Sequence, residues 1–205
     1  MDKVIPVTSR RALLGALVTT PTIAQVALAA APHNAALAAL WKAYDAEPVQ
    51  LLRTRDGRNL SRERYRRAEE FMLSLQRGVA GDWPDFLYFS GIVAQLALSS
   101  HLLDVGFPDA WCARHIGLQV ARSLAYANVS GFGLECAETQ RLAQVLTPYW
   151  KWNQRSLLDG PRPSDGGFAP DEVRTLLRAL IDQVRQVTGH SLSHRRMRGL
   201  AALQV

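Results

Sequence analysis

The chain has 205 residues, of which 48% are hydrophobic and 20% are charged, and its formal charge is +6. These proportions exclude a chain too polar to bury a core, and the length is that of a single globular domain. Almost all of the basic residues are arginines, since only Lys42 and Lys151 follow residue 31. This choice favours planar, bidentate pairing with carboxylates or phosphates over diffuse attraction by lysine.

Residues 1–31 have the organisation of an export signal. Residues 1–11 are basic, residues 12–32 contain no Asp, Glu, Lys or Arg, and the apolar part ends in Ala27-Leu28-Ala29. A basic start, an apolar middle and an exit of small residues are typical of a segment that directs export. We therefore expect residues 1–31 to be a signal helix that is cleaved after Ala29, and residues 32–205 to form one helical domain.

The arginine pair makes the type of signal more specific. Ser9-Arg10-Arg11 is followed by Ala12-Leu13-Leu14, and this run resembles the bacterial twin-arginine signal, whose pattern is Ser/Thr-Arg-Arg-x-Phe-Leu-Lys. Leu13 stands where that family often has Phe, and Gly15 stands where it often has Lys. The resemblance covers only the leader. Because such a signal is an address that a receptor reads, the resemblance implies folding before transport, a periplasmic destination, and the twin-arginine translocase and signal peptidase as partners.

Two alternatives stay open for the leader. A retained N-terminal amphipathic helix would keep the protein in the cytoplasm, and an uncleaved leader would anchor it in the membrane. A membrane span needs about 20 mainly apolar residues, and Pro21 and three nearby threonines interrupt this stretch. The pattern favours export, with no stable membrane span.

Apolar residues recur at helical spacing after the leader. Residues 34–46 form the first expected helix, which Pro48 ends. Residues 51–60 contain an Asp-Gly pair that indicates a loop. Ser61 is then the expected N-cap of a helix that closes near Gly78.

Residues 86–103 contain no charged side chain, and Asp82 and Pro84 are typical of a helix start just before them. A helix that is apolar on nearly all sides is buried, so this segment is the expected centre of the fold. Its five polar side chains argue for a protein core rather than a membrane span.

The remaining helices are expected at 110–128, 134–146, 170–188 and 191–203, with a Gly- and Pro-rich surface loop at 159–169. The sequence shows no convincing alternating strand pattern, no Gly-rich phosphate loop and no internal repeat. The expected fold class is all-α: a bundle of about six helices around residues 86–103, preceded by the signal helix.

Cys112 and Cys136 would meet an oxidising compartment after export. An unbroken helix over 109–128 would be roughly 30 Å long and would separate them. A disulfide needs Cα atoms within about 7 Å, so this geometry predicts two buried free thiols. A break in that helix would reverse the prediction.

Four residues are candidates for a metal site. Cys112 and His115 lie three apart on one expected helix, and His101 and Asp104 repeat this spacing on the neighbouring helix. They could meet if the helices pack in register. The alternative is a core cysteine with hydrogen-bonded histidines, because no Cys-x-x-Cys or His-Glu-x-x-His pattern accompanies them.

Two further clusters have ordinary structural explanations. His190 and His194 are four apart, but three arginines follow them, so they indicate a solvated basic tail. The aromatic run 149–152 could stack a sugar or another flat ligand, although aromatics near a helix end usually cap the core.

The densest basic run lies between residues 53 and 67. Without a nucleic-acid-binding motif, and with export expected, nucleic acid is an unlikely ligand. An exposed helix face is the simplest interpretation, and an acidic protein partner or lipid headgroups are the alternatives. The candidate partner-binding residues are Arg53, Arg55, Arg58, Arg62 and Arg66.

No Gly-x-Ser-x-Gly, Ser-x-x-Lys or paired-carboxylate pattern is present, so no catalytic residue is assigned. The sequence favours an exported, non-catalytic helical protein that binds or scaffolds a partner. The alternative is a small or accessory subunit of a cofactor-dependent redox enzyme, because the twin-arginine route often carries proteins that fold around a cofactor first. No particular cofactor is indicated.

Overall fold

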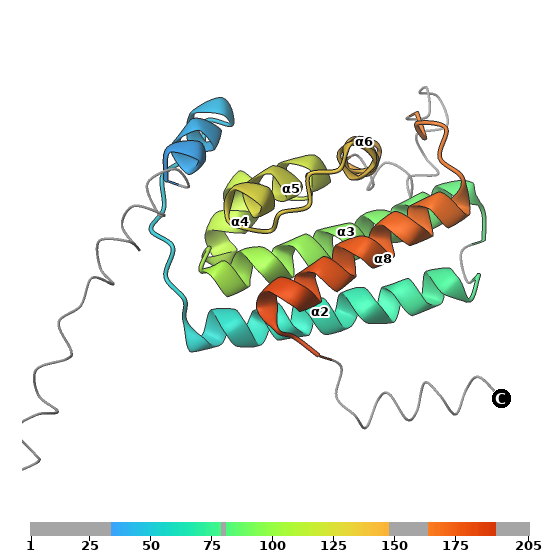
Figure 1. Ribbon diagram of the computed structural model, residues 1–205, viewed down its shortest axis with the longest axis horizontal. Helices are drawn as coiled ribbons and strands as arrows, with labels where there is room; N and C mark the ends of the chain where they lie inside the picture. Colours follow the sequence, from blue (N-terminus) through green and yellow to red (C-terminus); the bar gives the residue numbers. More distant parts are fainter. Residues whose placement is uncertain (1–33, 79–80, 148–163, 192–205) are drawn as a thin grey trace, which may run out of the picture.

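The computed structural model describes residues 34–78, 81–147 and 164–191, and within these ranges helices joined by loops are its regular structure, with no strands (Figure 1). The leader, the aromatic run 149–152 and the expected helix 191–203, apart from Ser191, lie outside them. The all-α bundle is confirmed. The helices span residues 34–43, α2 (Arg55–Gln76), α3 (Trp83–Val105), α4 (Asp109–His115), α5 (Val120–Val129), α6 (Ala137–Leu146) and α8 (Pro170–Thr188).

Helix α3 is the centre of the bundle. It packs against α2, α5, α6 and α8, and Figure 1 shows α2 along one side of it, α5 and α6 along the other, and α8 crossing in front. Among the described helices, α3 is the one long and apolar enough to cross a membrane by length and composition, yet 72% of its apolar window is buried by the other helices. It is apolar on nearly all sides because its neighbours surround it.

The two ends of α3 form where the sequence indicates. The Asp82 side chain accepts a hydrogen bond from the Asp85 N–H at 2.9 Å and caps the first turn. Gly106 ends the helix with φ of 111°. A Cβ on Gly106 would lie 2.7 Å from the backbone of Leu52, whose N–H donates to the Gly106 carbonyl at 3.2 Å. Both the left-handed backbone and this close approach therefore require glycine.

Helix α2 begins earlier than expected. Thr54 is its N-cap, accepting from the Gly57 N–H at 3.0 Å, and α2 begins at Arg55. The expected loop at 51–60 is therefore wrong over its second half. Ser61 is not a cap but a fully buried residue inside the helix. Ser61 lies four residues before Tyr65, so it extends the buried side of α2 by one more turn.

The expected helix 110–128 is also wrong, because it is broken into α4 and α5. Gly117 adopts φ of 59° between them. The break leaves backbone carbonyls without helical donors, and side chains replace these donors. Gln95 donates to the Gly117 carbonyl at 3.0 Å, and Arg122 donates to the His115 carbonyl at 2.6 Å. The break is thus a hydrogen-bonded corner of the fold.

Helix α8 matches its expected bounds and closes the bundle. Its apolar stripe, including Val173, Leu177 and Val184, is buried, and Gly189 ends it with φ of 71°. On its edge, Arg178 forms an ion pair with the buried Glu69 of α2 at 2.9 Å. Helix α8 packs against α3, and this ion pair also holds it against α2.

Candidate functional site

A buried polar cluster lies where α2 crosses α3. The Ser61 hydroxyl donates to the Ser100 carbonyl at 2.7 Å, and the Ser100 hydroxyl donates to the Ser61 carbonyl at 2.9 Å. Both serines are fully buried. This reciprocal pair requires two small side chains, because the backbones of the two helices must approach closely enough to accept each other's hydroxyl protons.

His190, just beyond the end of α8, joins this pair. Its Nε2 lies 2.6 Å from the Ser61 Oγ, and the residue is 4% exposed. The single proton of the Ser61 hydroxyl has two acceptors within reach, the Ser100 carbonyl and the His190 Nε2; when it goes to the carbonyl, the imidazole donates to Ser61 from Nε2. Burial lowers the pKa of His190. The predicted solvated tail is therefore wrong at His190, which is buried; His194 lies outside the described residues.

Asp104 brings a carboxylate to the edge of the cluster. Its Oδ1 lies 3.9 Å from the His190 Nε2 and 3.9 Å from the Arg58 Nε, and its Oδ2 lies 3.7 Å from Arg53. Asp104 is 6% exposed, whereas both arginine side chains are more than half exposed. The two arginines therefore neutralise a buried charge from the surface side.

Ser61, His190 and Asp104 resemble the components of a nucleophilic triad but have the wrong arrangement. In such a triad, the imidazole Nε2 accepts the serine proton and the carboxylate holds the Nδ1 N–H. Here the carboxylate approaches Nε2, the same nitrogen that contacts the serine, and not Nδ1. Since Ser61 is also fully buried, the cluster acts as a hydrogen-bonded lock between three helical segments.

The four candidate metal ligands do not come together. His101 packs on the Phe132 ring, with centroids 5.0 Å apart, while Asp104 faces α2 and His190. His115 packs against Trp111, with ring centroids 4.9 Å apart and the ring planes tilted by 37°. Over the described ranges, no group of three or more His, Cys, Asp or Glu could hold a metal ion. The helical register assumed for the site fails because the side chains three apart on α3 point to different neighbours.

The two cysteines have different environments. Both are free thiols, and Cys112 is buried as expected, with burial raising its pKa to about 12. Cys136 is exposed, contrary to expectation. Its sulfur accepts from the Thr139 N–H at 3.3 Å and caps α6. It lies outside the core because α6 begins at Ala137, three residues later than the expected helix.

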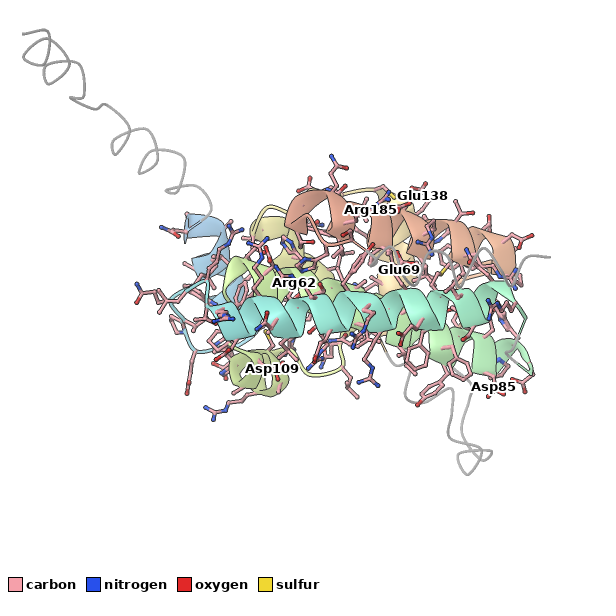
Figure 2. The ribbon with its side chains drawn as sticks, turned by 90° about the horizontal axis from the view of Figure 1, so that it is seen from below. Arg62, Glu69, Asp85, Asp109, Glu138 and Arg185 are labelled. Carbon is pink, nitrogen blue, oxygen red and sulfur yellow. The ribbon has the colours of Figure 1, made fainter. Side chains whose placement is uncertain are left out.

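The basic run divides into two groups. Arg53 and Arg58 turn towards Asp104, whereas Arg55, Arg62 and Arg66 are exposed along one flank of α2. Arg66 lies 4.0 Å from Glu70, and Arg62 donates to Asn59 at 3.4 Å. Figure 2 shows Arg62 on the side of α2 that faces α8, with Asp109 on the opposite side. The sequence placed these arginines on one run, and the helix separates them by their angle around its axis.

Comparisons with protein-family models, with curated proteins and with solved structures found no match for this chain. What the protein does must therefore be inferred from its own residues and contacts. Two features are the strongest guides: the sealed polar cluster and the arginines on the exposed flank of α2.

Replacing Ser61 with alanine should destabilise the fold without changing its architecture. The His190 Nε2 would lose its hydrogen-bond partner inside a buried site, which costs about 1–3 kcal/mol in the free energy of unfolding. Urea denaturation at pH 7 measures this loss. Ser74→Ala is the matched control on the same helix, since the Ser74 hydroxyl donates only to the Glu70 carbonyl at 3.3 Å near the surface. Equal effects of the two substitutions would contradict the lock.

Stability should fall as the pH decreases from about 6.5 towards 4. Burial lowers the pKa of His101 to about 4 and also lowers that of His190, whereas an unfolded histidine has a pKa of about 6.5. The unfolded state therefore binds more protons in this window, and His101 alone should reduce the free energy of unfolding by about 2 kcal/mol between pH 7.5 and 5. Urea denaturation across this range measures the slope, and His101→Gln should flatten it. An unchanged slope in that variant would show that other groups control the acid response.

Proposed function

We propose that this chain is an exported, non-catalytic helical protein that binds an acidic partner protein through its arginine face, defined as Arg55, Arg62 and Arg66 of α2, with Arg53 and Arg58, which also lie near Asp104, at its edge. The observation that carries this proposal is the row of exposed guanidinium groups along one flank of a helix whose other side is buried. The resemblance of the leader to a twin-arginine signal supports the exported location. The sealed serine–histidine cluster supports a binding role over nucleophilic catalysis.

The geometry of the arginine face suits recognition of carboxylates. Arg55 and Arg62 are two turns apart and Arg66 follows one turn later, so their side chains project from the same flank. One helical turn is about 5.4 Å, a spacing that carboxylates on a partner helix can match. Arginine pairs with a carboxylate through two parallel hydrogen bonds, which gives such a contact orientation as well as attraction.

The charges beside the arginine face favour a protein over a membrane surface. Asp56 and Glu63 are exposed and lie seven residues apart on α2, in a parallel row directly beside Arg55 and Arg62. An anionic bilayer would meet both rows and would be repelled by the acidic one. A folded partner can place carboxylates opposite one row and bases opposite the other. The alternation therefore fits a structured protein surface.

The exported location predicts a shortened chain. Intact mass spectrometry of fractionated cells that natively express the protein should find it in the periplasmic fraction without residues 1–29. Metal analysis and an absorption spectrum of the same sample test the accessory-subunit alternative, because stoichiometric metal or chromophore would favour it. Full-length soluble protein in the cytoplasm would contradict export.

Reversing charge on the arginine face should weaken partner binding while leaving the fold intact. The partner is first captured from a periplasmic extract on the immobilised mature protein and then purified. The affinity of the purified partner should fall at least about tenfold in Arg55→Glu/Arg62→Glu, because each attraction becomes a repulsion. Titration calorimetry measures this change, and the wild-type affinity should weaken as salt rises.

The matched control is Arg67→Glu/Arg77→Glu, which makes the same change in net charge at exposed positions outside the arginine face. Equal loss of affinity in both double variants would show general electrostatic attraction and contradict a defined face. Binding of the wild-type protein to phosphatidylglycerol vesicles, with no acidic protein captured, would replace the protein partner with a lipid surface and also contradict the proposal.

A further inference from the structure

A cavity of about 270 Å³ lies among α2, α3 and α4, on the side of α2 away from the arginine face. It adjoins the corner between α4 and α5, where Gly117 turns the chain away. The Gln95 side chain supports the corner by donating to the Gly117 carbonyl at 3.0 Å, so the cavity is built into the fold.

One wall of the cavity carries a polar group without a partner. Ser99 is 5% exposed and lines the cavity, and its hydroxyl forms no hydrogen bond with any part of the chain that the structure describes. A helical serine can bond to the carbonyl four residues earlier, as Ser90 does to Phe86 at 2.7 Å. Ser99 does not, so its hydroxyl is available to a bound molecule.

The other polar groups of the cavity are already engaged. The Gln95 amide donates to Gly117 and accepts from the Ser123 hydroxyl at 3.2 Å. At the rim, Arg64 and Asp109 form an ion pair at 3.1 Å, so they neutralise each other. The Cys112 thiol in the wall is uncharged at neutral pH, because burial raises its pKa to about 12. The site therefore has no net charge to attract an ion.

The remaining lining is apolar and reaches the surface. Leu102 and Ile116 are almost fully buried in the wall, and Leu118 at the mouth is 51% exposed, one of two large hydrophobic side chains that are exposed in the described ranges. An apolar cavity of about 150 Å³ holds benzene. By proportion, this cavity has room for roughly eleven non-hydrogen atoms. A molecule of that size would also cover Leu118.

We propose that this cavity binds a neutral, compact and mostly apolar molecule that carries one hydroxyl or carbonyl group, with that group hydrogen-bonded to Ser99. The apolar body lies against Leu102, Ile116 and Leu118, and the Arg64–Asp109 pair borders the mouth. This inference goes beyond the proposed partner protein and does not depend on it, since the two sites lie on different sides of α2.

Two probes test the site: 2-naphthol for a flat body and 1-nonanol for a linear one. Titration of each into the ¹⁵N-labelled protein should shift the amide resonances of Gly117 and Leu118 at the mouth. Naphthalene, which lacks the hydroxyl, should bind about fivefold more weakly than 2-naphthol, and the anion 2-naphthoate should bind more weakly than both. Failure of both 2-naphthol and 1-nonanol to bind would overturn the proposal, as would tighter binding of the anion.

Two substitutions assign the binding to this cavity. Ser99→Ala removes a hydroxyl that has no partner, so its stability should equal that of the wild type, while its affinity for 2-naphthol should fall to that for naphthalene. Ala113→Phe fills the mouth from an exposed position and should weaken 2-naphthol at least tenfold. Ala137→Phe, at an exposed position of α6, is the matched control and should bind normally. Unchanged affinity in both Ser99→Ala and Ala113→Phe would place the probes elsewhere and contradict the site.

Discussion

The reciprocal hydrogen bonds between Ser61 and Ser100 are the contact on which the rest of the arrangement depends. They set how closely α2 approaches α3, and the Ser61 Oγ also hydrogen-bonds to the His190 Nε2 and so fixes the end of α8. All three side chains of this group are buried and hydrogen-bonded to one another, which leaves none of them open to a substrate. A buried polar network that is satisfied in this way specifies one packing of three helices rather than several.

This lock also determines which arginines are available at the surface. With α2 held in one rotational position, Arg58 comes within reach of the buried Asp104, as does Arg53 just before the helix, while Arg62 projects along the exposed flank. Two arginines of the basic run thus stabilise the buried Asp104 carboxylate. The arginines that remain exposed are the ones whose angle around the helix axis carries them past Asp104, and these are the residues that a partner could contact.

The sequence predicted the class of fold and the central helix, because an uncharged run of this length has no stable position except the core. The prediction was wrong at positions where one residue type can have two structural roles. Ser61 is a common N-cap residue, but the spacing from Ser61 to Tyr65 and Ala68 also continues the buried stripe, and tertiary packing decided between them. The predicted continuous helix was wrong at Gly117 for a similar reason, since a single glycine inside a helical pattern does not reveal a break. The error at His190 came from the basic tail after it, which concealed that the helix end folds back against α2.

The corner at Gly117 borders the cavity, which lies on one of two chemically different sides of α2. The wall formed by Ser99 and Leu102 lies beside this corner, and Leu118 at the mouth of the cavity is exposed. On this side of α2, Asp109 neutralises Arg64 in an ion pair at 3.1 Å. Arg62 lies on the other flank. Among the described residues, no carboxylate is within ion-pair distance of it. Residues two apart on a helix point about 200° apart. One basic run therefore gives α2 a neutral side, which suits an uncharged molecule, and a cationic side, which suits carboxylates.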